Sequence, residues 1–255
     1  MVVLPDPQPP PSQNTFAVRT GVATSYHVPL SGRLDPSDTF MPVTEQLPDG
    51  GIQLSPDDIA ALDARWSSAW SPSEVAHRLA GIATPWCVAA GWALDLFRGA
   101  QTRAHGDIEI AIPAATFPEI RERFPEHIFD AVGDRRIWEN ATPAQLADTH
   151  QTWLRDPATG HYLLDVFREP HDGDYWICRR DETIRLPYSD VIGYTADGIP
   201  YLAPELVLLF KAKHGRTKDQ TDFAGSLPHM TRRQRETLAG LLARVHPGHP
   251  WLAAL

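Results

Sequence analysis

The sequence predicts an α+β protein with a mixed β-sheet flanked by helices and a C-terminal helical segment. Short apolar runs with strand periodicity occur between residues 86 and 178, and amphipathic patterns with Ser-Pro helix starts precede them. Beyond Pro200 every periodic segment is helical. The predicted organisation is an extended or partly disordered arm over 1–55, a core with two leading helices over 56–198, and a helical domain over 199–255.

The predicted elements follow from local signals. Ser55-Pro56 and Ser71-Pro72 each offer a serine N-cap followed by proline at the first helical position. Gly91 ends a short apolar strand, and Gly99 closes the helix after it. Gly133-Asp134 is typical of a hairpin turn. In chain order we expect helices starting at 56 and 72, a strand over 86–90, a helix over 92–98, a strand over 107–112, a helix over 117–124, a hairpin over 128–138, strands over 161–167 and 175–178, and helices over 204–213, 219–227 and 232–245.

Composition indicates a soluble globular protein of 255 residues. No apolar run approaches the roughly 20 residues that cross a bilayer, and the N-terminus lacks the pattern of a secretory signal. The two cysteines, Cys87 and Cys178, are far apart and form no CxxC motif, which favours a reducing cytoplasm. We therefore expect a cytoplasmic protein with no membrane partner.

The charge distribution is uneven. The net charge is −9, but the segment from Glu205 to the end has eight Lys/Arg and four Asp/Glu, or +4, which leaves −13 for the remainder. An acidic body disfavours a nucleic-acid partner, whereas a basic tail suits a compact anion such as a triphosphate. A charge distribution that serves only solubility is the plainer interpretation.

Three carboxylates are the candidate catalytic and metal-binding residues. Asp107 and Glu109 alternate with isoleucines, so on a strand both side chains project from one face. Asp165 lies in a run of apolar residues, where an unpaired carboxylate is costly. Three carboxylates on adjacent strands suit Mg²⁺. The alternatives are an edge strand whose polar face meets water for the first pair, and a salt bridge to an arginine for Asp165.

The turn before these acids supplies candidate anion-binding groups. Gly91-Trp92 stands at a strand-to-helix junction, where backbone N–H groups favour phosphate, although a tight connection alone also explains the glycine. Arg103 and His105 lie between the turn and the acids and either neutralise phosphate or are ordinary loop residues. Lys211 ends an apolar helix, from which it either reaches a phosphate or extends into solvent. We expect Asp219 and Asp222 to serve only as first-turn acids of the next helix.

Other chemistries have little support in the sequence. It contains no G-x-S-x-G, G-x-x-x-x-G-K-[ST] or G-x-G-x-x-G motif. The 11 histidines are scattered without zinc-ligand spacing.

The motifs GWALDLFRG, TRAHGDIEIAIP, LLDVF, IPYLAPELVLLFKAK and RTKDQTDF together resemble the DNA polymerase β-like nucleotidyltransferases. The finer resemblance is to the antibiotic nucleotidyltransferases of the aminoglycoside 2″-adenylyltransferase-like group. It covers residues 86–223 and, more loosely, the PGHPWL ending, but not the first 55 residues. It implies a polymerase β-like fold in which Asp107, Glu109 and Asp165 hold two Mg²⁺ ions.

The resemblance also implies that Ala90, Gly91 and Trp92 bind the triphosphate, with Arg103, His105 and Lys211 around it. The family usually has glycine where this chain has Ala90, and alanine is costly there if the position requires φ > 0. The implied reaction moves an NMP, with AMP from ATP favoured, to a hydroxyl of a small molecule, releasing pyrophosphate; a cationic acceptor is expected if the acidic body shapes its site. Two alternatives are transfer to a macromolecule such as tRNA or protein, and nucleotide binding without catalysis. Acceptor identity is expected to depend on the shapes of loops around residues 139–160 and 168–200.

Overall fold

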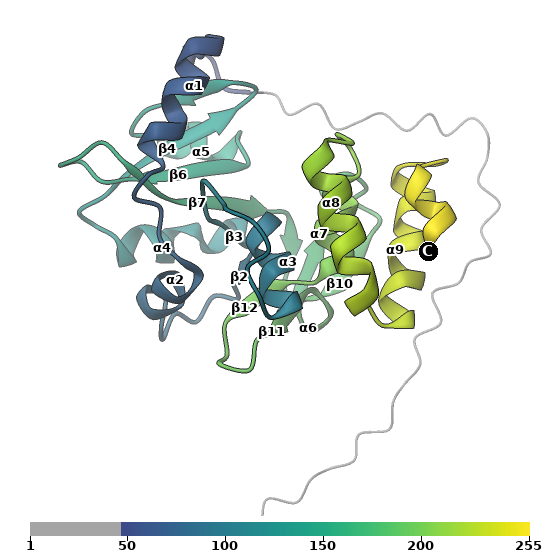
Figure 1. Cartoon of the computed structure of the whole chain (residues 1–255). Coiled ribbons are helices and arrows are strands. Elements are labelled where there is room, and N and C mark those ends of the chain that lie inside the picture. The colour runs from purple at the N-terminus through teal and green to yellow at the C-terminus, as the bar shows by residue number, and fades with distance from the viewer. Residues whose placement is uncertain (1–46) are drawn as a thin grey trace, which may run out of the picture. The chain divides into compact units, whose positions relative to one another are not determined.

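The computed structural model describes residues 47–255 (Figure 1). Most of the predicted arm lies outside these residues, but Leu47 and the short strand β1 are within them. A mixed nine-stranded sheet has the order β1-β5-β4-β6-β7-β3-β2-β12-β11, and a smaller antiparallel sheet has the order β10-β9-β8. The strands of the larger sheet are β1 (Ile52–Gln53), β2 (Cys87–Val88), β3 (Glu109–Pro113), β4 (Ile128–Gly133), β5 (Arg136–Trp138), β6 (Gln151–Arg155), β7 (Tyr162–Glu169), β11 (Ile192–Tyr194) and β12 (Pro200–Leu202). The smaller sheet comprises β8 (His171–Asp172), β9 (Tyr175–Ile177) and β10 (Arg185–Pro187).

The helices follow the predicted order closely. The described α-helices are α1 (Pro56–Arg65), α2 (Pro72–Arg78), α3 (Ala90–Arg98), α4 (Phe117–Arg123), α5 (Pro143–Ala147), α6 (Tyr188–Val191), α7 (Pro204–Lys211), α8 (Thr217–Ser226) and α9 (Arg232–Val245). Capping boxes at Ser55 and Ser71, each followed by proline, explain where α1 and α2 begin. Gly99 ends α3 in the left-handed conformation, as its position predicts.

Strand β3 lies inside the sheet, parallel to β7 and antiparallel to β2. Its two faces meet different layers. Ile108, Ile110 and Ile112 are buried in the cluster that includes residues of α2 and α4. Ala111 faces the other cluster, which includes residues of α3, α7, α8 and α9. Figure 1 shows these last four helices gathered on one side of the sheet. Because side chains alternate along a strand, Glu109 projects toward that helical side.

The predicted fold class is therefore confirmed: a mixed sheet is flanked by helices, with helices at the C-terminal end. Residues 139–160, for which the sequence predicts no helix or strand, contain α5 and β6. Thr152 and Leu154 of β6 are buried while their neighbours are partly exposed, so the strand alternates, but with too little apolar character to identify it from sequence. Segment 168–200 likewise carries β8–β11 and α6 between its loops.

The predicted domain boundaries stay predictions. The residues after 198 contribute β12, which pairs in parallel with β2 of the larger sheet through Tyr201 and Val88. Among residues 47–255, no helix is both long enough and apolar enough to cross a membrane. Cys87 and Cys178 are both buried free thiols.

Candidate active site

Two of the three predicted carboxylates lie on neighbouring strands, and the third, Asp107, lies just before one of them. Glu109 of β3 is in register with Asp165 of the parallel strand β7, and Asp107 precedes Glu109 by two residues. β3 is an interior strand, so the alternative of an edge strand is wrong. Asp165 is 2% exposed and accepts a hydrogen bond from Gln151 of β6 rather than from an arginine. Its Oδ1 atom is buried and has no hydrogen-bond partner among residues 47–255.

The carboxylates destabilise one another's charged forms. Burial raises the pKa of Glu109 well above its usual value, and the charges of Asp107 and Asp165 raise it further. Burial also raises the pKa of Asp165, which the hydrogen bond from Gln151 offsets in part, while Asp107 adds to the increase. Unlike charges nearby would have the opposite effect. The three carboxylates therefore repel one another when charged, and a bound cation would reduce this repulsion.

The donor set suits a hard divalent cation, although it is not a closed site. Within residues 47–255, no three His, Cys, Asp or Glu side chains are grouped closely enough to hold a metal ion. Bringing three carboxylates to coordination distance requires a positive charge between them, because like charges repel. The unpartnered Oδ1 of Asp165 and the raised pKa of Glu109 are the features that fit Mg²⁺, which prefers carboxylate oxygens.

The raised pKa of Glu109 predicts how stability depends on pH. A carboxyl group whose pKa is raised in the folded state stabilises the folded protein when it is protonated. This stabilisation is complete below the unfolded pKa, about 4.3 for Glu, and is lost as pH rises through the folded pKa. We expect Glu109→Gln to unfold with nearly the wild-type free energy at pH 4.5 but to be the more stable protein at pH 8. Urea unfolding in EDTA at the two pH values measures the difference.

Glu236→Gln is the matched control, because Glu236 lies on the exposed face of α9 and pairs only with Arg232 among the ion pairs of the described residues. Glu236→Gln should not become more stable relative to wild type as the pH rises from 4.5 to 8. A Glu109→Gln difference that stays constant from pH 4.5 to pH 8 would contradict the proposed repulsion.

Ala90 and Gly91 are the first two residues of α3, so the helix begins before the predicted residue 92. Ala90 has φ +49°, in the left-handed region that favours glycine, so the alanine strains this position. No side chain of the described residues caps the N-terminus of α3. At Gly91, an added Cβ would lie 2.7 Å from Cε1 and 2.8 Å from Nδ1 of His105 and would also collide with the Arg103 guanidinium. Gly91 is thus required by close approach of the following loop.

Trp92 and His105 hold the loop between α3 and β3 against α3. Their rings stack with centroids 4.3 Å apart, and the indole N–H of Trp92 donates to the carbonyl of Asp107 at 3.1 Å. His105 Nε2 lies 2.7 Å from Oδ2 of Asp95, and the His105 side chain is 3% exposed. Burial lowers the pKa of His105, more than the hydrogen bond to Asp95 raises it. As placed, His105 and Trp92 hold the backbone of Asp107, and their nucleotide-binding role stays a prediction.

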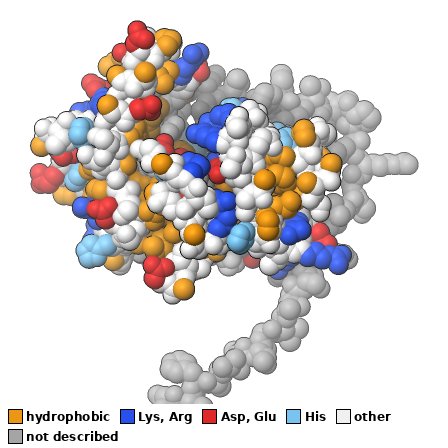
Figure 2. Space-filling view, viewed as in Figure 1, with side chains coloured by type: hydrophobic (Ala, Val, Ile, Leu, Met, Phe, Trp, Pro, Cys, Tyr) orange, Lys and Arg blue, Asp and Glu red, His pale blue; other side chains and the backbone are white. Residues whose placement is uncertain are grey.

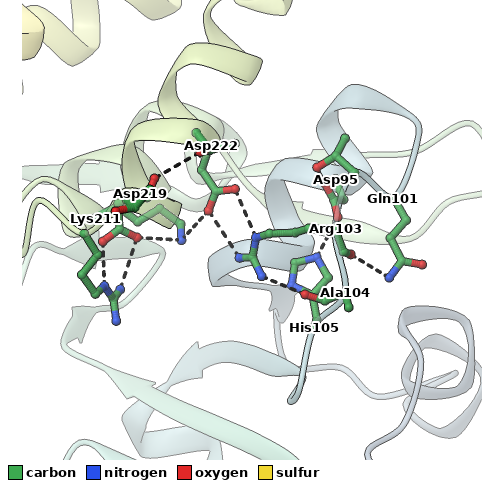
Figure 3. A network of polar contacts seen from close by, with 12 residues as sticks. Asp95, Gln101, Arg103, Ala104, His105, Lys211, Asp219 and Asp222 are labelled. Carbon is green, nitrogen blue, oxygen red and sulfur yellow. Dashed lines mark hydrogen bonds and ion pairs between the residues drawn. The ribbon is translucent and has the colours of Figure 1, made fainter.

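Lys211 is buried rather than extended into solvent, so that alternative is wrong. It is 8% exposed, and its Nζ lies 2.8 Å from Asp222 and 3.3 Å from Asp219. Its charge also lowers the pKa of Glu109. Arg103 binds the other side of Asp222, as Figure 3 shows. Arg103 and Lys211 are therefore brought together at one buried aspartate, and the charge of Lys211 acts on Glu109.

Sequence reasoning missed three residues of this site. Gln151 bonds Asp165 from a strand that was not predicted. Asp95 on α3 binds His105, Thr102 and Arg98. Asp222, predicted to be only a first-turn acid, is 2% exposed and joins two cations. The apolar context of Phe223 beside Asp222 was the available signal for its burial.

The surface around the site keeps the predicted charge asymmetry. In the view of Figure 2, Lys and Arg side chains gather over the region of α7 and α8, whereas Asp and Glu side chains are scattered over the part of the molecule nearer α1. This agrees with the +4 C-terminal segment.

Residues 73–156 match the family model described as aminoglycoside-2″-adenylyltransferase. The matched segment contains the turn at Ala90-Gly91, Asp107 and Glu109, and ends before Asp165. The predicted resemblance is confirmed over this segment. No match was found among curated protein sequences.

Solved structures show more distant likenesses. The lincosamide antibiotic adenylyltransferase LnuA with lincomycin bound is 17% identical, with 62% of this chain and 95% of that chain covered and a TM-score of 0.44. ANT(2″)-Ia in complex with adenylyl-2″-tobramycin is 13% identical, with 68% and 95% covered and a TM-score of 0.46. An antigenic nucleotidyltransferase-like protein from Paracoccidioides brasiliensis is 19% identical, with 80% and 94% covered and a TM-score of 0.36.

Proposed function

We propose that this chain, a nucleotidyltransferase similar to the aminoglycoside-2″-adenylyltransferases, transfers AMP from ATP to a hydroxyl of a small molecule and releases pyrophosphate. The observation that supports this most is that Glu109 of β3 is in register with Asp165 of β7. Asp107 lies two residues before Glu109, and the buried Lys211 is nearby. Acidic side chains elsewhere on the surface favour a cationic acceptor, of which an aminoglycoside-like compound is one class.

Asp107, Glu109 and Asp165 would hold two Mg²⁺ ions. Bound there, the ions would lower the pKa of the acceptor hydroxyl and offset the negative charge of the phosphates. The acceptor oxygen forms a bond to the α-phosphorus, the bond from that phosphorus to the β-phosphate oxygen breaks, and pyrophosphate leaves. Asp165 Oδ1, which has no hydrogen-bond partner in the described part of the chain, accepts the hydroxyl proton.

The remaining residues bind and orient the nucleotide. Arg103 and Lys211 counter the charge of the triphosphate, and the uncapped N-terminus of α3 at Ala90-Gly91 supplies backbone N–H groups. His105 and Trp92 hold the loop that carries Arg103 and the carbonyl of Asp107. The predicted cytoplasmic location and the small-molecule acceptor belong to the same proposal.

The test uses labelled ATP and a panel of aminoglycoside, lincosamide and other hydroxyl acceptors, with release of pyrophosphate as a second readout. We expect wild-type turnover on at least one acceptor, reduced by about 10²- to 10³-fold in Asp107→Asn, because a charge that stabilises the transition state is lost. Equal turnover in both proteins would rule out the carboxylate mechanism. Tight ATP binding without pyrophosphate release on any acceptor would favour the non-catalytic alternative, which the strained Ala90 motivates.

A further inference from the structure

Asp222 of α8 joins two cations that come from different parts of the chain. Its Oδ2 lies 2.8 Å from Nζ of Lys211, at the end of α7. Arg103, from the loop between α3 and β3, reaches it with two nitrogens, Nε to Oδ1 and a terminal nitrogen to Oδ2, each at 3.3 Å. Figure 3 shows the aspartate between the two basic side chains. One carboxylate therefore fixes the positions of both groups.

This arrangement restricts side chains that are otherwise mobile. Lysine and arginine each have about 2 kcal/mol of rotamer entropy when free, so an unanchored pair would occupy many positions. A two-nitrogen contact of a guanidinium with a carboxylate also fixes the plane of the arginine. Burial raises the pKa of Asp222, but the hydrogen bonds from Arg103 and Lys211 outweigh it and lower the pKa, so the carboxylate is charged.

The neighbouring Asp219 has a different set of partners. It is fully buried and binds Lys211 at 3.3 Å, but its second partner is Arg216, whose side chain is 52% exposed and which immediately precedes α8. Asp219 thus connects Lys211 to α8, the helix that carries Asp219. Only Asp222, of these two, reaches across to the loop that carries Arg103 and closes over Gly91.

Both cations held by Asp222 face the other parts of the site. The charge of Lys211 acts on Glu109, and the guanidinium of Arg103 approaches Gly91 so closely that no Cβ fits there. Asp222 itself binds neither the carboxylates nor the glycine turn among the described contacts. Its influence on the site therefore passes through Arg103 and Lys211.

We propose that Asp222 is the positioning residue of the nucleotide half of the site, holding Arg103 and Lys211 where the triphosphate of an NTP binds. This inference rests on the proposed function for the identity of the ligand. It gives Asp222 no contact with the nucleotide and no part in proton transfer. Consequently its loss affects the nucleotide and leaves recognition of the acceptor unchanged.

The experiment compares wild type with Asp222→Asn, which keeps the shape of the side chain and removes its charge. Calorimetry with a non-hydrolysable ATP analogue and Mg²⁺ gives nucleotide affinity, and steady-state kinetics gives KM for ATP and for the acceptor. We expect ATP affinity to fall and KM for ATP to rise by about 10- to 100-fold, as for other misplaced binding groups, with the acceptor KM unchanged. Asp222→Glu, which keeps the charge but moves the carboxylate, should lie between the two.

Asp181→Asn is the matched control for loss of a buried, paired aspartate. Asp181 is 5% exposed and pairs with Arg244 of α9, in an ion pair that shares no residue with the Asp222 network. It should lower the melting temperature without changing KM for ATP. If Asp222→Asn does not fold, Asp222→Glu is compared with wild type in its place.

The outcomes separate this inference from the proposed function. Wild-type protein that binds the ATP analogue but transfers nothing contradicts the function, and the binding comparison still decides the role of Asp222. Unchanged ATP affinity in the Asp222 variants, or equal increases in the KM of ATP and of the acceptor, overturns the positioning role. Wild-type protein that does not bind ATP overturns both.

Discussion

Asp165→Asn is expected to reduce turnover by about 10²- to 10⁴-fold while making the folded protein more stable. The activity is lost because Asn cannot accept the acceptor's proton, a role that contributes about this factor in enzymes. The stability increases because the asparagine side chain would still accept the hydrogen bond from Gln151 but would no longer place a buried charge near Asp107. Urea unfolding in EDTA and turnover with saturating ATP measure the two effects.

The same substitution at Asp130 should have the opposite effect on stability. Asp130 of β4 is fully buried but binds Arg155 at 2.6 Å and accepts from the backbone N–H of Asn140. Removing one partner of a buried ion pair leaves the other charge uncompensated, which costs about 3–5 kcal/mol. We therefore expect Asp130→Asn to be markedly less stable. An Asp165→Asn protein that is both less stable and fully active would contradict the assignment of Asp165 to the site.

The comparison of these aspartates explains what the sequence could predict. Asp165 stood out because apolar residues flank it on both sides, and the alternation of Asp107 and Glu109 with isoleucines predicted their common face. Both signals are local, since strand periodicity depends only on neighbouring residues. Sequence reasoning therefore identified the carboxylates before any pairing of strands was known.

The partners of these groups were not predictable in the same way. Gln151 meets Asp165 only because β6 pairs with β7 in one register, and a slip of one residue would turn Gln151 to the other face. Asp222 meets Arg103 across 119 positions of sequence. Likewise, the resemblance indicated that Ala90 stands where the similar family usually has glycine, but the positive φ that makes alanine costly there is a property of the folded chain. Such contacts depend on tertiary packing, which no local pattern records.

Gly91→Ala and Ala90→Gly, at the first two residues of α3, are expected to change stability in opposite directions. The new methyl group at position 91 would meet the guanidinium of Arg103 and the ring of His105. Asp222 holds the guanidinium of Arg103, so displacing it weakens that ion pair. His105 is held between Trp92 and Asp95, so displacing its ring adds to the penalty. Overpacking of this kind costs about 1–3 kcal/mol.

Ala90→Gly removes a Cβ from the left-handed region, where L-residues lose about 1–2 kcal/mol, and adds about 0.5–1 kcal/mol of chain entropy to the unfolded state. The first effect is larger, so this variant should be more stable by about 0.5–1 kcal/mol. Denaturant unfolding of both variants measures the changes. Turnover should fall in Gly91→Ala, because moving His105 also moves Trp92 and the Asp107 carbonyl that its indole binds. A Gly91→Ala protein with wild-type stability would show that the loop yields freely, and the rigid support inferred for Asp107 would then be wrong.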